Sequence, residues 1–153
     1  MFKRILVTMD DSKTAHYALD KAIELASEQK ALLRIVHVVD YVNLTAGVEG
    51  VNVERFMESL KDFGKELLHR AVARAAEKGV KAQQKLIESS EIMSHIAGQI
   101  LTDADKWRAD LIVIGTHGRK GIKRLFWGSV AESIIRDTTK PILIFRKKQR
   151  SKR

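Results

Sequence analysis

The segment 115–129, GTHGRKGIKRLFWGS, combines four glycines with four basic residues and contains no acidic residue. Gly115 and Gly118 allow the backbone to turn sharply and to approach a ligand closely. Gly128 and Ser129 directly precede a helical pattern, and the start of a helix presents unpaired N–H groups and a positive dipole end. These features favour a polyphosphate site. A serine at this place is also a common helix N-cap, so Ser129 alone would indicate only a helix start.

The spacing of this loop differs from the common phosphate-binding motifs. It lacks the G-x-x-x-x-G-K-[ST] pattern of the Walker P-loop and the G-x-G-x-x-G pattern of dinucleotide sites. It reads G-x-x-G, then nine residues, then G-S. The loop also follows an apolar segment that is typical of a buried strand.

Apolar segments that predict strands alternate with helical patterns along the chain. The predicted strands are 2–8, 32–39, 80–87, 110–114 and 141–145. The predicted helices are 12–29, 51–78 with Gly79 as its end, one that begins at Ser89 or Ser90 and continues through Leu101, and 129–138. This alternation predicts a single α/β domain with a parallel sheet and helices on both faces. The segment 80–87 is more polar than the others, so we expect it at a sheet edge.

Two predicted strands end in residues that are suited to ligand binding. The first strand ends at Thr8, Met9 and Asp10, and the fourth ends at Gly115. Ligands of open parallel sheets bind beyond the carboxyl ends of the strands, where the strand order reverses. If these two strands are neighbours, Asp10 and the glycine loop face one crevice.

The G-x-x-G-x9-G-S spacing after a fourth strand resembles the universal stress protein family, in its ATP-binding branch. Three other features are similar to that family: the opening strand followed by Asp10 and Ser12, the second strand ending in the sequence HVVD at 37–40, and the close in Lys140-Pro141 before an apolar strand. The resemblance covers residues 2–146, nearly the whole chain.

The resemblance implies a doubly wound, Rossmann-like fold of the adenine nucleotide alpha hydrolase type, with strand order 3-2-1-4-5. It implies a nucleotide-binding domain over 1–146, followed by a basic tail over 147–153 that we expect to be disordered. It also implies a homodimer formed through the last strand, 141–146. The implied function is that of an ATP-binding regulatory module of the stress response.

The family's site residues carry over as follows. Asp10 would lie near the ribose or the adenine edge, Thr8 and Met9 would line the same wall, and Val38 would meet the adenine through its backbone. The phosphates would be held by the loop and the helix that follows it, with Mg²⁺ accompanying the triphosphate. The phosphate-side residues are Gly115, which would allow close approach, and Thr116, Gly118, Arg119, Gly128, Ser129 and Val130.

Two other functions stay open from the residues. A slow ATPase or phosphotransferase would need positioned charge and a metal ion, which this loop supplies in part. A nucleic-acid binder would use the loop, with a charge of +4, and the tail 146–153, with +6. Subtracting these ten charges from the formal net charge of +9 leaves −1 for the remainder of the chain. A nearly neutral body makes nucleic acid an unfavoured partner.

Composition narrows the remaining classes. A chain of 153 residues suits one domain. It has no cysteine, no run of about 20 apolar residues and no signal peptide pattern at its start, so we expect a cytoplasmic protein without disulfides or membrane spans. The five histidines have no metal-ligand spacing, and we expect no metal site of protein ligands. His37 lies in a predicted buried strand and is expected to be a core residue with a satisfied ring.

Overall fold

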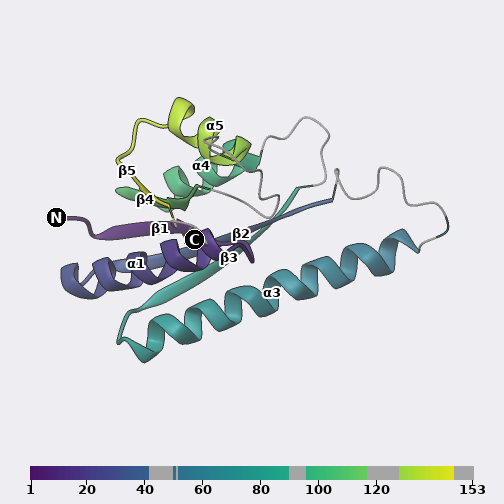
Figure 1. Cartoon of the computed structure of the whole chain (residues 1–153), viewed down its shortest axis with the longest axis horizontal. Helices are drawn as coiled ribbons and strands as arrows, with labels where there is room; N and C mark the ends of the chain where they lie inside the picture. Colours follow the sequence, from purple (N-terminus) through teal and green to yellow (C-terminus); the bar gives the residue numbers. More distant parts are fainter. Residues whose placement is uncertain (42–49, 51, 90–95, 117–127, 147–153) are drawn as a thin grey trace, which may run out of the picture.

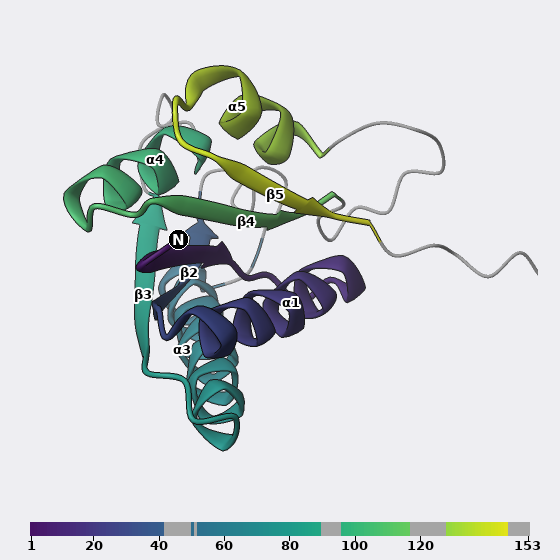
Figure 2. The same ribbon diagram turned by 90° about the vertical axis from the view of Figure 1, so that its left-hand side faces the viewer.

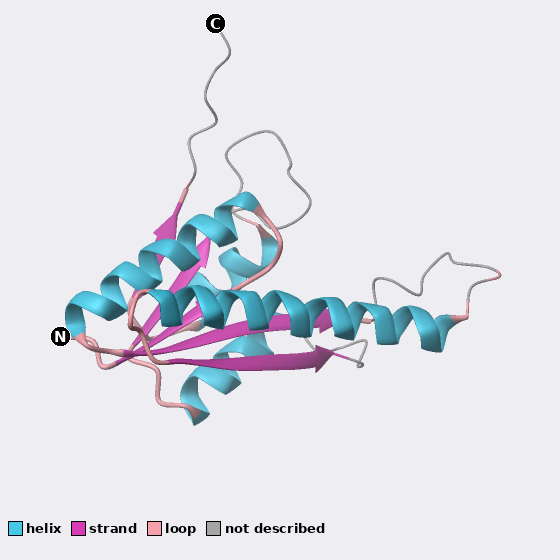
Figure 3. Cartoon of the chain, turned by 90° about the horizontal axis from the view of Figure 1, so that it is seen from below, coloured by secondary structure: helices cyan, strands magenta, loops and turns pink. Residues whose placement is uncertain are grey.

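A computed structural model describes residues 1–41, 50, 52–89, 96–116 and 128–146. They form one five-stranded sheet in which every strand pair is parallel. The strands are β1 (Arg4–Thr8), β2 (Leu32–Asp40), β3 (Ala82–Ser89), β4 (Leu111–Gly115) and β5 (Ile142–Phe145). Their order in the sheet is β3-β2-β1-β4-β5, which confirms the predicted order. Figure 3 shows the strand arrows all directed away from one end of the sheet.

The helices cover both faces of the sheet. They are α1 (Lys13–Gln29), α3 (Val53–Glu77), α4 (Ile96–Lys106) and α5 (Ser129–Asp137). Figures 1 and 2 show α1 and α3 on one face, with α4 and α5 on the other. This layered arrangement confirms the predicted α/β fold. No helix in the described part of the chain is both long enough and apolar enough to cross a membrane.

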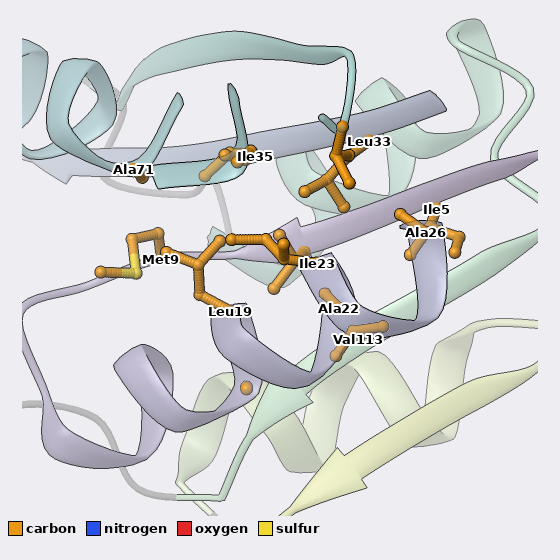
Figure 4. Packing of buried hydrophobic residues seen from close by; sticks show 14 of the residues in the cluster. Ile5, Met9, Leu19, Ala22, Ile23, Ala26, Leu33, Ile35, Ala71 and Val113 are labelled. Carbon is orange, nitrogen blue, oxygen red and sulfur yellow. The ribbon is translucent and has the colours of Figure 1, made fainter. Parts of the chain in front are cut away.

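The core is divided by the sheet into two clusters, because successive side chains of a strand point to opposite faces. In β1, Ile5 and Val7 belong to the first core cluster, under α1 and α3, whereas Leu6 belongs to the second, under α4 and α5. Figure 4 shows Leu19 and Ile23 of α1 packed in the first cluster. All five of these side chains are almost completely buried.

The ends of the first two helices follow from their sequence. The Ser12 side chain accepts a hydrogen bond from the N–H of Ala15 at 3.1 Å and caps α1. The Asn52 side chain caps α3 in the same way, by accepting from the N–H of Arg55 at 3.2 Å. Gly79 follows α3 with φ +71°, a conformation that glycine adopts without strain. The predicted end of this helix is therefore confirmed to within two residues.

The third predicted helix does not begin at Ser89, which was one of its two predicted starts. Ser89 is the last residue of β3, where it pairs with Asp40 of β2 and is buried. Its carbonyl accepts a hydrogen bond from the N–H of Tyr41 at 3.1 Å. Strand pairing therefore outweighs the local preference of serine for a helix cap. Ser90 and the rest of 90–95 lie outside the described residues, and the described helix begins at Ile96.

A network of ionic and hydrogen-bonded side chains joins the amino-terminal ends of β1, β2 and β3 to α4. Arg34 of β2 donates from Nε and Nη2 to the two carboxylate oxygens of Asp103, at 2.7 and 2.9 Å. The Trp107 ring has the guanidinium carbons of Arg34 and Arg4 each 5.5 Å from its centroid. The indole N–H of Trp107 donates to Gln83 of β3 at 2.9 Å. This network lies at the end of the sheet opposite the carboxyl ends of the strands.

Candidate functional site

The first and fourth strands are neighbours, as the switch-point hypothesis requires. Ile5 pairs with Leu111 and Val7 pairs with Val113. Continuing this register by two residues places Met9 level with Gly115. The chain moves outward from β1 through β2 to β3 on one side, and from β4 to β5 on the other. The strand order therefore reverses between β1 and β4, and the carboxyl ends of these two strands are the expected ligand position.

The end of β1 turns into α1 through a hydrogen-bonded sequence of residues. The N–H of Met9 donates to the carbonyl of Val36 at 2.7 Å, which continues the pairing of β1 with β2. The Asp10 carboxylate accepts from the N–H of Ser12 at 2.8 Å, and Ser12 caps α1. Asp10 is therefore held near the carboxyl end of β1 by the turn that begins the helix.

The end of β4 lies against the first turn of α1. A Cβ atom on Gly115 would lie 2.8 Å from the carbonyl carbon and from the carbonyl oxygen of Thr14, and 3.0 Å from the N of Ala15. Real Cβ atoms do not approach backbone this closely, so glycine is required at this position by packing within the chain. Close approach was predicted at Gly115 for a ligand; the close neighbour that the structure identifies is the backbone of α1.

The glycine loop begins and ends at residues that are joined to each other. The N–H of Gly128 donates to the carbonyl of Thr116 at 2.8 Å, and the N–H of Thr116 donates to the carbonyl of Phe145 at 3.1 Å. Thr116 itself is buried. These bonds bring the start of α5 next to the end of β4. The intervening predicted site residues Gly118 and Arg119 lie outside the described residues.

The N-cap of α5 is Gly128, which has no side chain to cap the helix. Ser129 is the first helical residue and is exposed. The interpretation of Ser129 as a serine N-cap is therefore wrong, because the helix begins at Ser129 itself, one residue earlier than that interpretation requires. Gly128 makes no side-chain cap hydrogen bond to the first turn of α5, and N–H groups at a helix start are suited to an external anion as their acceptor.

Val38 and Val130 complete the set of predicted residues. Val38 of β2 pairs with Ile87 of β3. Its side chain packs against the second core cluster, as does that of Val130 in the first turn of α5. Val38 belongs to the strand beside β1, so the strands carrying Thr8, Val38 and Gly115 stand next to one another in the sheet. The predicted site residues that the structure describes thus come from three adjacent strands and one helix start.

One residue at this site was not predicted to have a role there. His37 is buried, and its Nδ1 lies 2.7 Å from the carbonyl oxygen of Met9. The expectation of a satisfied core histidine is confirmed. The signal that sequence reasoning could have used is that a buried histidine needs a polar partner, and that its strand ends beside the proposed site.

A second ionisable cluster lies where the carboxyl ends of β2 and β3 meet α3. Lys61 of α3 lies 2.7 Å from the Glu88 carboxylate, and this hydrogen bond lowers the pKa of Glu88 and raises the pKa of Lys61. Burial, followed by the negative charge of Glu88, raises the pKa of Tyr41. These three residues line a hollow of about 330 Å³ together with Met57 and neighbouring charged residues of α3. In the described part of the chain, no group of three or more His, Cys, Asp or Glu side chains is arranged to hold a metal ion.

Comparison with known proteins identifies relatives along nearly the whole chain. Residues 1–146 match the model of the universal stress protein family. A universal stress protein of Methanocaldococcus jannaschii is 36% identical over 150 residues, which cover 96% of this chain and 84% of that protein. The structure of a universal stress family protein from Burkholderia pseudomallei has a TM-score of 0.75 at 33% identity, covering 94% of this chain and 95% of that one.

A universal stress protein of Archaeoglobus fulgidus, solved in complex with dAMP, has a TM-score of 0.64 at 26% identity. The similarity covers 93% of this chain and 96% of that one. The family model, the sequence relatives and the solved structures all agree on one assignment. This chain belongs to the universal stress protein family.

Proposed function

We propose that residues 1–146 form an ATP-binding domain, and that nucleotide occupancy makes the protein a regulatory module of the stress response. The observation that carries this proposal is the hydrogen bond between Thr116 and Gly128, which brings the start of α5, with glycine as its N-cap, to the end of β4. Asp10 stands at the neighbouring strand end. The group that would bind phosphate and the group that would bind the nucleoside therefore lie at the carboxyl ends of neighbouring strands.

The proposed contacts divide between the two ends of the nucleotide. Thr8, Met9 and Asp10 form the nucleoside wall, and the backbone of Val38 meets the adenine. The N–H groups at the start of α5 and the exposed hydroxyl of Ser129 bind phosphate oxygens. Gly118 lets the loop approach the phosphates, and Arg119 opposes their charge.

The relative of Archaeoglobus fulgidus that binds dAMP supports an adenine nucleotide as the ligand. The four basic residues of 119–124 favour a ligand with several phosphates, because each added phosphate increases the electrostatic attraction. The ligand of this proposal is therefore ATP. Mg²⁺ would be bound through the triphosphate and would neutralise part of its charge.

We propose a homodimer through 141–146 as the assembly that carries this site. β5 is an edge strand, and its Leu143 side chain is 38% exposed. An exposed apolar strand at a sheet edge favours pairing with another chain. A cytoplasmic location belongs to the same proposal and is supported by the absence of cysteine, which suits a reducing compartment.

Thermal unfolding with ATP-Mg²⁺, ADP, AMP, cyclic AMP and GTP tests this proposal. A ligand at about 100 times its dissociation constant adds about 2.7 kcal/mol to the free energy of unfolding, which raises Tm by several degrees. We expect the largest shift with ATP and none in the Gly118→Val variant. Gly98→Ala is the matched control, since Gly98 is an exposed residue of α4 with open space around it, and this variant should keep the full shift.

The same preparation separates a regulator from an enzyme. Phosphate release from ATP, measured over hours with and without Mg²⁺, should stay far below the rate that a metabolic ATPase requires. Turnover that depends on Gly118 would assign a slow ATPase or phosphotransferase instead. Absence of any nucleotide shift would remove the proposed ligand and make the basic loop and tail candidates for nucleic-acid binding.

A further inference from the structure

His37 connects the second strand to the nucleoside wall. Its Nδ1 lies 2.7 Å from the carbonyl oxygen of Met9, and the residue as a whole is 8% exposed. A backbone carbonyl can only accept a hydrogen bond, so Nδ1 must carry the proton and donate it. The tautomer of His37 is therefore determined by Met9.

Met9 is held by β2 at both of its backbone polar groups. Its N–H donates to the carbonyl of Val36, and its carbonyl accepts from His37. The donor–acceptor distance is 2.7 Å in both hydrogen bonds. The carbonyl of Met9 shares a peptide plane with the N–H of Asp10, so this bond also orients the residue that follows. The position of Asp10 is therefore set by β2 from one side and by its turn with Ser12 from the other.

The opposite side of the His37 ring is packed against α3. A Cβ atom on Gly64 of α3 would lie 2.7 Å from Cδ2 of His37 and 3.2 Å from its Nε2. It would also lie 2.9 Å from Leu86, the residue that pairs with His37 across β2 and β3. Because Gly64 has no side chain, there is room for the His37 ring beside α3. The ring cannot move away from Met9 without displacing α3.

We infer that His37 is a positioning residue for nucleotide binding: through its Nδ1–H it orients the Met9–Asp10 wall, and Gly64 of α3 keeps its ring in place. This role rests on the proposed nucleotide site. His37 touches the nucleoside only through Met9 and Asp10, so its contribution concerns the nucleoside and not the phosphates. Movement of α3 at Gly64 would be transmitted to the same wall.

Binding measurements on two variants of His37 test this role. His37→Leu introduces an apolar side chain of similar size and removes the hydrogen-bond donor. His37→Asn keeps an N–H donor close to the position of Nδ1. A neutral hydrogen bond contributes about 1 kcal/mol, so His37→Leu should weaken the binding of ATP and of AMP by about fivefold. His37→Asn should restore most of this loss.

The affinity for inorganic tripolyphosphate distinguishes a positioning role from a general structural defect, because only a general defect would lower it. Its affinity should be the same in the parent, His37→Leu and His37→Asn, because it has no nucleoside. Gly64→Ala, which displaces the ring from the side of α3, should reproduce the selective loss of ATP and AMP affinity. All titrations are made well below the Tm of each variant. Unchanged ATP affinity in His37→Leu, or an equal loss for tripolyphosphate, would overturn the positioning role.

Hydrogen exchange of the unliganded protein separates this role from the nucleotide proposal. In His37→Leu, the amides of Met9, Asp10 and Asp11 should exchange faster, while those in the middle of α1 keep the parent rate. If the parent binds no nucleotide, the proposed function fails, and the exchange result still decides whether His37 orients this turn. Parent-like exchange at Met9 and Asp10 would overturn the inference whatever the parent binds.

Discussion

Gly115 of β4 and Thr14 of α1 are in direct backbone contact, although they lie far apart in the chain. The position of a Cβ atom on Gly115 lies 2.8 Å from the Thr14 carbonyl carbon and oxygen. Backbone atoms cannot turn aside as a flexible side chain can. The contact therefore fixes how closely the first turn of α1 approaches the end of β4, where the glycine loop begins.

Gly115→Ala should destabilise the protein by about 1–3 kcal/mol, the usual cost of overpacking a close contact. The matched control is Gly98→Ala, which meets no atom within 4 Å and should be neutral or stabilising by up to about 1 kcal/mol. Urea denaturation of both variants measures the difference. Equal stabilities for Gly115→Ala and the parent would show that α1 and β4 are less closely packed than described.

The bidentate pair of Arg34 and Asp103 is expected to be a major stabilising contact of α4. Both side chains are largely buried, with exposures of 16% and 9%. Asp103→Ala should cost about 3–5 kcal/mol, because it leaves a guanidinium without its counter-ion in a poorly hydrated place. Arg34→Lys should cost less, since lysine keeps the charge and loses the forked geometry.

The control for this pair is Arg136→Lys in the exposed pair of Arg136 with Asp137. That variant should have no measurable effect on the denaturation midpoint. If Asp103→Ala and Arg136→Lys were equally harmless, the network around Trp107 would not contribute to the attachment of α4.

Tyr41 should titrate above the ordinary pKa of tyrosine. Burial and the charge of Glu88 raise its pKa in the folded chain. Its stabilising contribution is therefore complete below the pKa of the unfolded residue, about 10, and is lost as pH rises through the folded value. The chain has two tyrosines, so Tyr17→Phe leaves Tyr41 as the only one.

Phenolate absorbance of the Tyr17→Phe protein measures this titration directly. Adding Glu88→Gln should move the midpoint of Tyr41 back toward its ordinary value, because it removes a negative charge that opposes ionisation. An ordinary midpoint before this addition, or no response to it, would contradict the placement of Tyr41 beside Glu88.

The proposed dimer should depend on Leu143. Leu143→Asp places a charge on the exposed side of β5, and desolvating that charge opposes strand pairing. Light scattering should report a dimer for the parent and a shift toward monomer for the variant. Gln84→Asp lies on β3 at the other sheet edge and should leave the dimer intact. A monomeric parent at tens of micromolar would exclude this assembly.

Most of the fold was predictable because its signals are local. Short apolar runs such as 32–39 and 110–114 are typical of buried strands. The polar character of 80–87 correctly indicated a sheet edge. The prediction for Ser89 was wrong because its secondary structure depends on pairing with Asp40, which lies on another strand. A residue that suits a helix cap is equally compatible with the end of a strand.

The strand ends that carry the candidate site residues were predictable, but the contacts of these residues were not. The adjacency of β1 and β4 followed from the expected order, and it places Asp10 and Gly115 at the carboxyl ends of neighbouring strands. The packing of Gly115 on Thr14 and the hydrogen bond from His37 to Met9 join positions far apart in the chain. Such contacts depend on how closely a helix settles on the sheet, and no local pattern specifies that distance.

The measurement that tests the proposed nucleotide site most directly is photolabelling with 8-azido-ATP, followed by mapping of the labelled peptides. The proposed site predicts saturable labelling of segments that contain Thr8–Asp10 or Val38, suppressed by excess ATP and lost in Gly118→Val. Labelling confined to the basic tail 147–153 or to the hollow between α3 and β3, or labelling that excess ATP does not suppress, would contradict a nucleotide site at the switch point between β1 and β4.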